Sequence, residues 1–205
     1  MGNLENLLAY SATLGTAEKR TGTLPRTFVG FSSTDIGQYR LMCAWKAHEH
    51  IDFDFADFQL DQAINSTDEN YIKRLCRDKI RRAETYALLI GQDTYTKTTY
   101  VKWEVEVAIE KGCRLIGINL NSSRFKDYLC PSFFADRGAL FVPFSPRIVA
   151  TALEWNPQPR NPSLPDDWHF LDSVYAAKGY TLNGNSARLP PPPNPFASGR
   201  PSWAK

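Results

Sequence analysis

The 205-residue sequence predicts an α/β protein with one doubly wound parallel sheet, and two observations carry this prediction. Short apolar runs alternate along the chain with segments in which apolar residues recur at helical spacing. The runs at residues 86–91 and 114–120 are mainly apolar, as strands covered on both faces are, and they flank a helical segment at 99–112. Five such strands alternating with helices indicate a five-stranded flavodoxin-like sheet with the strand order 2-1-3-4-5.

The individual elements follow from periodicity and from their flanking residues. We expect strands at residues 27–32, 53–58, 86–91, 114–120 and 139–144, and helices at 35–47, 69–83, 99–112 and 146–155. Asp alternates with apolar residues in 53–58, which is typical of an edge or half-exposed strand. Ser66 and Glu69 form a capping box before the second helix, and Ser145 precedes a proline at the first turn of the last helix.

The distribution of proline divides the chain into three parts. Residues 1–25 carry no usable motif and are predicted to be an N-terminal arm. Residues 26–155 contain all the expected strands and helices, and form the predicted domain. Residues 156–205 are rich in proline, including the run at 190–193, so we expect a partly disordered C-terminal extension.

Composition narrows the class of protein. An apolar content of 42% suffices for a core, while a net charge of +2 gives no argument for nucleic-acid binding. The basic face of the helix at 69–83 has no interleaved aromatic residues, so we interpret it as a solvated surface.

The four cysteines have no C-x-x-C spacing, and His48 and His50 lack a third ligand, so no disulfide, zinc or other metal site is predicted. Neither a signal peptide nor a membrane-spanning run is evident, and a cytoplasmic location without membrane contact is expected.

Two segments at the carboxyl ends of the first and third strands are candidates for a ligand site. The loop at 30–35 offers backbone and hydroxyl donors from Ser32 and Ser33 where a helix begins, which suits a phosphate or ribose. Glu104 borders the buried stripe of the next helix, whereas Glu106 and Glu110 point away from it. We expect the loop and Glu104 to flank one cleft, although a plain helix cap and a dipole-stabilised Glu explain the same residues.

Taken together, five segments resemble the TIR-like domain of the Thoeris anti-phage ThsB family. They are residues 26–40, 53–57, 72–82, 87–91 and 100–105, and the resemblance extends over about 26–155. The family has a Phe-Ser loop after the first strand and a helix start in which a Glu follows an aromatic residue. Tyr100 stands where the family usually has Trp.

The resemblance implies an enzyme that consumes NAD as a substrate, without a separate cofactor, by cleaving the bond between nicotinamide and ribose. Glu104 would be catalytic, Phe31 and Trp103 would shape the cleft, and the polar part of NAD would bind at three residues of the loop: Ser32, Ser33 and Asp35. The ADP-ribose product, cyclic or open, would act as a diffusible signal for a separate effector protein. A phage-derived trigger and a homo-oligomer are compatible with this function.

Two other functions remain open at this point. The domain could be a non-catalytic TIR-type module that assembles protein partners, with Glu104 serving the fold alone. It could also be an enzyme related to nucleoside deoxyribosyltransferases, which would act on an N-glycosidic bond of a nucleoside in place of NAD.

Overall fold

The computed structural model describes residues 26–48, 53, 55–57, 69–97, 99–155 and 167–180. The predicted arm at 1–25, the capping residue Ser66 and the proline run at 190–193 lie outside this part of the chain.

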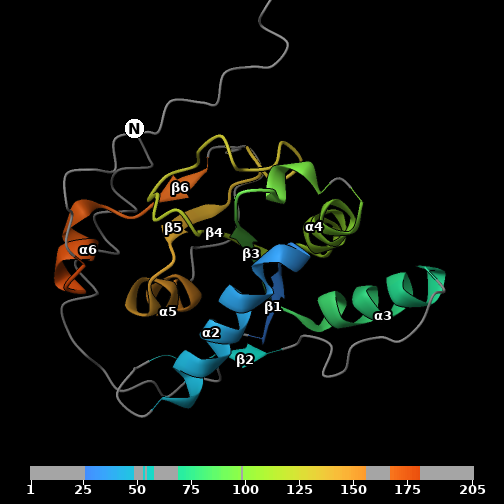
Figure 1. The fold of residues 1–205 in the computed structure, drawn as a ribbon, viewed down its shortest axis with the longest axis horizontal. Helices are drawn as coiled ribbons and strands as arrows, with labels where there is room; N and C mark the ends of the chain where they lie inside the picture. The colour runs from blue at the N-terminus through green and yellow to red at the C-terminus, as the bar shows by residue number, and fades with distance from the viewer. Residues whose placement is uncertain are drawn as a thin grey trace, which may run out of the picture.

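Within the described residues the strands form one parallel sheet in the order β2-β1-β3-β4-β5-β6 (Figure 1). Their bounds are Arg26–Gly30 for β1, Ala56–Asp57 for β2, Thr85–Ile90 for β3, Arg114–Asn119 for β4, Leu140–Pro143 for β5 and Trp168–His169 for β6. The predicted α/β class and the order of the first five strands are confirmed, as is the edge position of β2. The sixth strand is an addition that the sequence did not indicate.

Helices α2 to α5 match the four predicted segments closely, whereas α6 was not predicted. They are α2 (Ile36–Ala47), α3 (Glu69–Arg82), α4 (Tyr100–Lys111), α5 (Pro146–Glu154) and α6 (Asp172–Ala177), with 3-10 turns η1 (Ser33–Asp35) and η2 (Thr94–Thr96). Ser145 occupies the N-cap position of α5, but its side chain makes no capping hydrogen bond. Among the described residues, none of these helices combines the length and apolar character needed to cross a membrane.

The core consists of two apolar layers, one on each face of the sheet. Val29 and Leu89 pack on one face with residues of α2 and α5, such as Met42. Phe28 and Leu88, their neighbours in sequence, pack on the other face with residues of α3 and α4. This two-residue alternation is what parallel strands buried on both faces require. Figure 1 shows α3 extending from the body of the molecule on the α4 side.

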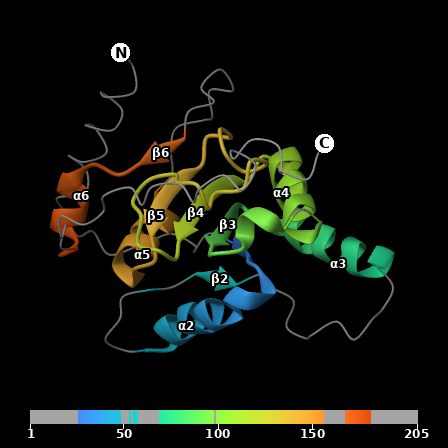
Figure 2. The same ribbon diagram turned by 45° about the horizontal axis from the view of Figure 1, so that its top comes forward.

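The sheet continues beyond residue 155, where the sequence suggested a domain boundary. β6 pairs with β5, and α6 lies next to it in both views (Figure 2). Phe170, Val174 and Tyr175 are buried in the core layer that contains α5. Residues 167–180 are therefore part of the folded domain, although the predicted domain ended at residue 155.

Candidate functional site

Glu104 lies in the second turn of α4, where its carboxyl group meets β1 and β3. The Tyr86 hydroxyl donates a hydrogen bond to Glu104 Oε2 at 3.3 Å. Gly30 ends β1 at this point, and a Cβ atom there would lie 2.0 Å from Tyr86 Oη and 3.2 Å from Glu104 Oε2. The missing side chain at Gly30 therefore leaves the space that the hydroxyl and the carboxyl group occupy.

The predicted helical geometry of α4 accounts for this placement. Of the predicted buried stripe, Val101, Val105 and Ala108 are buried, Ile109 is partly buried and Gly112 is exposed; Val107, which was not part of the stripe, is buried as well. Glu104 lies beside this stripe and is partly exposed, whereas Glu106 and Glu110 are exposed. Among the three acidic residues of α4, only Glu104 thus has its carboxyl group directed into the protein.

The surroundings of Glu104 favour the neutral form of its carboxyl group. Burial raises its pKa to about 8, although the hydrogen bond from Tyr86 acts in the opposite direction. Glu104 as a residue is partly buried, and its carboxyl group lies against the Tyr86 hydroxyl and the end of β1. Neither of the two causes involves a cation. A positively charged ligand at this point would therefore stabilise the carboxylate.

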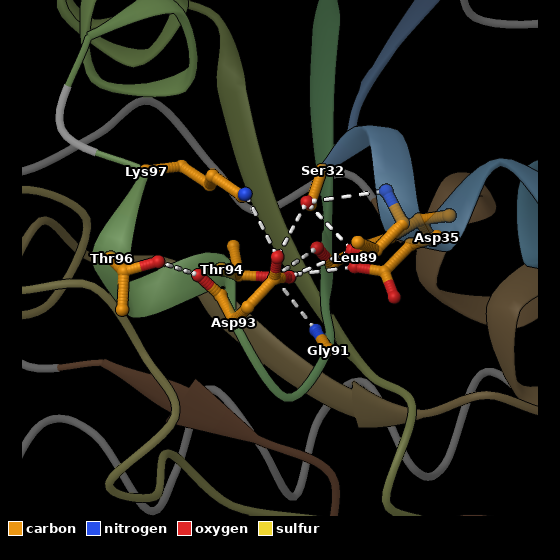
Figure 3. A network of polar contacts seen from close by, with 9 residues as sticks. Ser32, Asp35, Leu89, Gly91, Asp93, Thr94, Thr96 and Lys97 are labelled. Carbon is orange, nitrogen blue, oxygen red and sulfur yellow. Dashed lines mark hydrogen bonds and ion pairs between the residues drawn. The ribbon is translucent and has the colours of Figure 1, made fainter.

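A second polar cluster joins the loops that follow β1 and β3 (Figure 3). The Asp93 carboxylate accepts hydrogen bonds from Thr34 Oγ1 at 2.8 Å and from Ser32 Oγ at 3.2 Å, and it pairs with Lys97 Nζ at 2.9 Å. Ser32 Oγ also accepts a hydrogen bond from the Thr34 backbone N–H. Asp93 therefore connects the two loops at the sheet edge where β1 and β3 end.

Asp35 lies beneath this junction, beside Gly91. Thr94 Oγ1 contacts Asp35 Oδ2 at 3.4 Å and accepts a hydrogen bond from the Gly91 N–H at 2.8 Å. Burial, followed by the nearby negative charge of Asp93, raises the pKa of Asp35. The pKa of Asp93 is lowered instead, chiefly by the hydrogen bond from Lys97. The two neighbouring carboxyl groups therefore differ in how readily they ionise.

The structure brings some of the predicted site residues together and separates others. Ser32 and Asp35 share the junction with Asp93, and Ser33 is exposed beside it. Phe31 stacks on Tyr39 of α2 at 4.8 Å and packs against the core layer of that face. Phe31 and Glu104 thus lie on opposite faces of the sheet, so Phe31 is no wall beside the Glu104 carboxyl group.

Trp103 lies on the same face as Glu104. It packs partly buried against the core layer of α3 and α4, and the Arg77 guanidinium lies 5.6 Å from its ring centre. The other arginines on the described part of α3 are exposed, as the prediction of a solvated basic face requires. The part of the chain that the structure describes contains no group of three His, Cys, Asp or Glu residues that could hold a metal ion.

The sequence did not indicate Tyr86, Asp93 or Thr94 as site residues. Tyr86 lies in an apolar strand, where its ring is counted as a core residue and its hydroxyl gives no separate signal. Asp93 and Thr94 act through residues of a loop about sixty positions earlier, and only the tertiary fold brings them together. The one available signal was their position directly after a buried strand.

The parallel sheet, the loop junction at the β1–β3 edge and the Glu that borders the core in the helix after β3 define a TIR-like α/β domain. The family model described as the TIR-like domain of Thoeris protein ThsB matches residues 28–124, a little under half of the chain. This segment, which includes Glu104, is therefore similar to the ThsB TIR-like domains, and the resemblance noted from the sequence is confirmed. The match connects the protein with TIR-type function in anti-phage defence. No curated protein matches the chain.

Proposed function

We propose that the protein cleaves NAD between nicotinamide and ribose, with the Glu104 carboxylate stabilising the positive charge that develops on the ribose. One observation carries this proposal. The Glu104 carboxyl group is held at the carboxyl end of β1, in the space that Gly30 leaves, by a hydrogen bond from the Tyr86 hydroxyl, and burial raises its pKa. Strongly shifted carboxyl groups of this kind cluster at functional sites.

The chemistry of NAD suits a single carboxylate. The nicotinamide ring is cationic in NAD, and it takes the electron pair of the C–N bond and leaves as a neutral molecule, so no general acid is needed. The ribose becomes oxocarbenium-like in the transition state, and a fixed negative charge nearby stabilises it. Water then completes the reaction to ADP-ribose and releases a proton. Attack by a hydroxyl group of the same molecule gives a cyclic isomer instead.

The protonation state of Glu104 fits a cationic substrate. With a pKa of about 8, Glu104 is mostly neutral in the free protein at neutral pH. A bound pyridinium ring lowers this pKa because it attracts the charged form. Substrate binding and ionisation of the carboxyl group therefore favour each other.

The polar part of NAD is assigned to the loop after β1. Ser32 and Ser33 precede α2, and hydroxyl groups at a helix start suit the diphosphate. Asp93 accepts the Ser32 hydroxyl in the structure, so a phosphate competes with this carboxylate for it. Trp103 lies one residue from Glu104 and is assigned to the same substrate. The product then acts on a separate effector protein as a diffusible nucleotide.

The test is to incubate the purified full chain with NAD and to measure free nicotinamide, with and without an extract of phage-infected cells that could supply an activator. Nicotinamide release supports the proposal. Release of a base from nucleosides, with NAD left intact, would favour the nucleoside enzyme. Failure to act on either substrate, even with the extract, would contradict catalysis and favour an interaction module.

A further inference from the structure

We propose that Tyr86 is the positioning residue for Glu104: its hydroxyl fixes the orientation of the carboxyl group and supplies the donor that stabilises its charged form. A role of Tyr86 in catalysis rests on the proposed function. The hydrogen bond between Tyr86 and Glu104 is a property of the fold, and its effect on Glu104 can be measured without any activity.

The geometry leaves the Tyr86 hydroxyl little freedom. The ring is fully buried and stacks on Phe28 with 5.9 Å between the ring centres. Its hydroxyl fits against Gly30, where even one added carbon would lie 2.0 Å away. A donor held in this way can point to Glu104 Oε2 and can keep the carboxyl group at the end of β1.

The contacts around Glu104 make Tyr86 its identified donor. Desolvation and the Tyr86 hydrogen bond are the two causes of its pKa shift. Hydrogen bonding to a carboxylate favours the charged form, so the hydroxyl opposes the effect of burial. Phe at position 86 would keep the ring and lose the donor.

Among the described residues, the titratable groups facing Glu104 come from α3 and β3. Burial, and after it the nearby negative charge of Glu104, raises the pKa of the Cys76 thiol in α3 to about 11. Burial also raises the pKa of Tyr86 well above its ordinary value. Arg77 of α3 lies over the ring of Trp103, the residue before Glu104. Between pH 5 and 9 the Glu104 carboxyl group is thus the member of this cluster that titrates.

The experiment is a pH titration of the full chain by carbon-13 NMR, with labelled glutamate carboxyl groups. The Glu104 signal is assigned by its loss in Glu104→Gln. We expect Tyr86→Phe to move the Glu104 midpoint to higher pH by about one unit, since a hydrogen bond to a charged group is lost. In the wild type, the ring carbon that carries the Tyr86 hydroxyl should shift at the same midpoint as Glu104. This second signal requires no substitution and remains available if Tyr86→Phe does not fold.

Tyr175→Phe is the matched control. Tyr175 is also fully buried, and its hydroxyl has no hydrogen-bond partner among the described residues. This substitution removes a buried hydroxyl from the opposite core layer. The Glu104 midpoint should therefore stay at its wild-type value.

Gly30→Ala disturbs the same contact from the other side. The added methyl group displaces the Tyr86 hydroxyl, so the Glu104 midpoint should again rise. In the double variant with Tyr86→Phe the two shifts should not add, because only one hydrogen bond is lost.

An unchanged Glu104 midpoint in folded Tyr86→Phe would overturn the proposal, as would a wild-type Tyr86 signal that does not respond when Glu104 titrates. Neither result depends on NAD cleavage. If the wild type does release nicotinamide, Tyr86→Phe should move the acid limb of kcat/KM to higher pH, and most of the rate should return above the new midpoint. A loss of rate that is equal at every pH would contradict the stabilisation of the charged form by the Tyr86 hydroxyl.

Discussion

At Glu104, burial and hydrogen bonding act on one carboxyl group in opposite directions, and burial dominates. Its pKa of about 8 lies well above the ordinary value of 4.5. The group therefore changes charge within the physiological range, where the proposed chemistry needs the charged form.

The first prediction at this scale concerns the pH dependence of NAD cleavage. The dependence of kcat/KM on pH reports ionisations of the free enzyme. Because the carboxylate is the active form, kcat/KM should rise about tenfold per pH unit below the midpoint and level off above about pH 8. Initial rates at low NAD concentration between pH 5.5 and 9.5 measure this. A profile that is already flat from pH 5.5 to 7 would mean that an ionised Glu104 is not required.

The second prediction concerns folding stability. The pKa of Glu104 is higher in the folded than in the unfolded chain, so between about pH 4.5 and 8 the folded state binds more protons. This contribution to stability is complete at low pH and is lost as pH rises through about 8. Glu104→Gln does not titrate. Relative to wild type, it should therefore gain on the order of 1–3 kcal/mol between pH 5 and 8.5, or several degrees in melting temperature.

Thermal unfolding of both proteins at pH 5 and pH 8.5 tests this directly. Glu106→Gln serves as the control, because Glu106 is exposed and its change should be the same at both pH values. A constant difference between Glu104→Gln and wild type at both pH values would show that Glu104 is not buried as a neutral acid.

The sequence predicted the position of Glu104 but not its partner. A period of 100° per residue relates Glu104 to the apolar stripe of α4, and that local geometry survives in the fold. Tyr86 could not be recognised as the partner of Glu104. The alternation of residues in a strand predicts the face of the sheet on which a side chain lies, but not the group that its hydroxyl contacts. Phe31 stacks on Tyr39, and the sequence contains no signal for that choice of face.

At the scale of the elements, the close packing of the two loops at the β1–β3 edge requires a glycine at position 91. A Cβ atom on Gly91 would lie 2.4 Å from both carboxyl oxygens of the buried Asp35. Gly91→Ala should therefore destabilise the protein by about 1–3 kcal/mol, as overpacking does. Chemical denaturation, with the loss read as a lower midpoint, measures the effect.

Gly37→Ala provides the matched control for this substitution. Gly37 lies in the first turn of α2, and nothing lies within 4 Å of a Cβ atom built there. Since Ala favours helix, this variant should be neutral or more stable by up to about 1 kcal/mol. Equal effects of the two substitutions would contradict the packing of Asp35 against Gly91.

The elements that the sequence predicted well are those with enough residues to show a period. β3 and β4 are six-residue strands made mainly of apolar residues, and α4 repeats its apolar stripe over three turns. β6 has two residues, Trp168 and His169, which no periodicity can reveal. Only Ala56–Asp57 of the predicted 53–58 strand pairs with β1 in the described part of the chain, although Phe53 and Phe55 are buried.

At the scale of the whole molecule, the fold extends beyond the segment that matches the family. The match ends at residue 124, whereas β5, α5, β6 and α6 complete the sheet and one core layer. Arg124 stands at this boundary and forms a salt bridge with Asp172 of α6. The C-terminal elements are therefore structural parts of the domain in this chain.

A truncation series tests this organisation. Deleting residues 189–205 should leave the melting temperature nearly unchanged, because the proline density of this segment disfavours helices and strand ladders. Deleting residues 167–205 should lower it by more than about 10 °C or prevent folding, because Phe170, Val174 and Tyr175 leave the core. A large drop with the shorter deletion would instead show that the proline-rich end packs on the domain.

The most direct test of the proposed function compares three variants of α4 under conditions in which the wild type releases nicotinamide. Glu104→Gln keeps the size of the side chain and removes its charge, so the rate should fall at least a hundredfold, on the order of 3 kcal/mol of transition-state stabilisation. Glu106→Gln and Glu110→Gln alter exposed residues of the same helix and should stay within a few-fold of wild type. Wild-type nicotinamide release by Glu104→Gln would contradict the account.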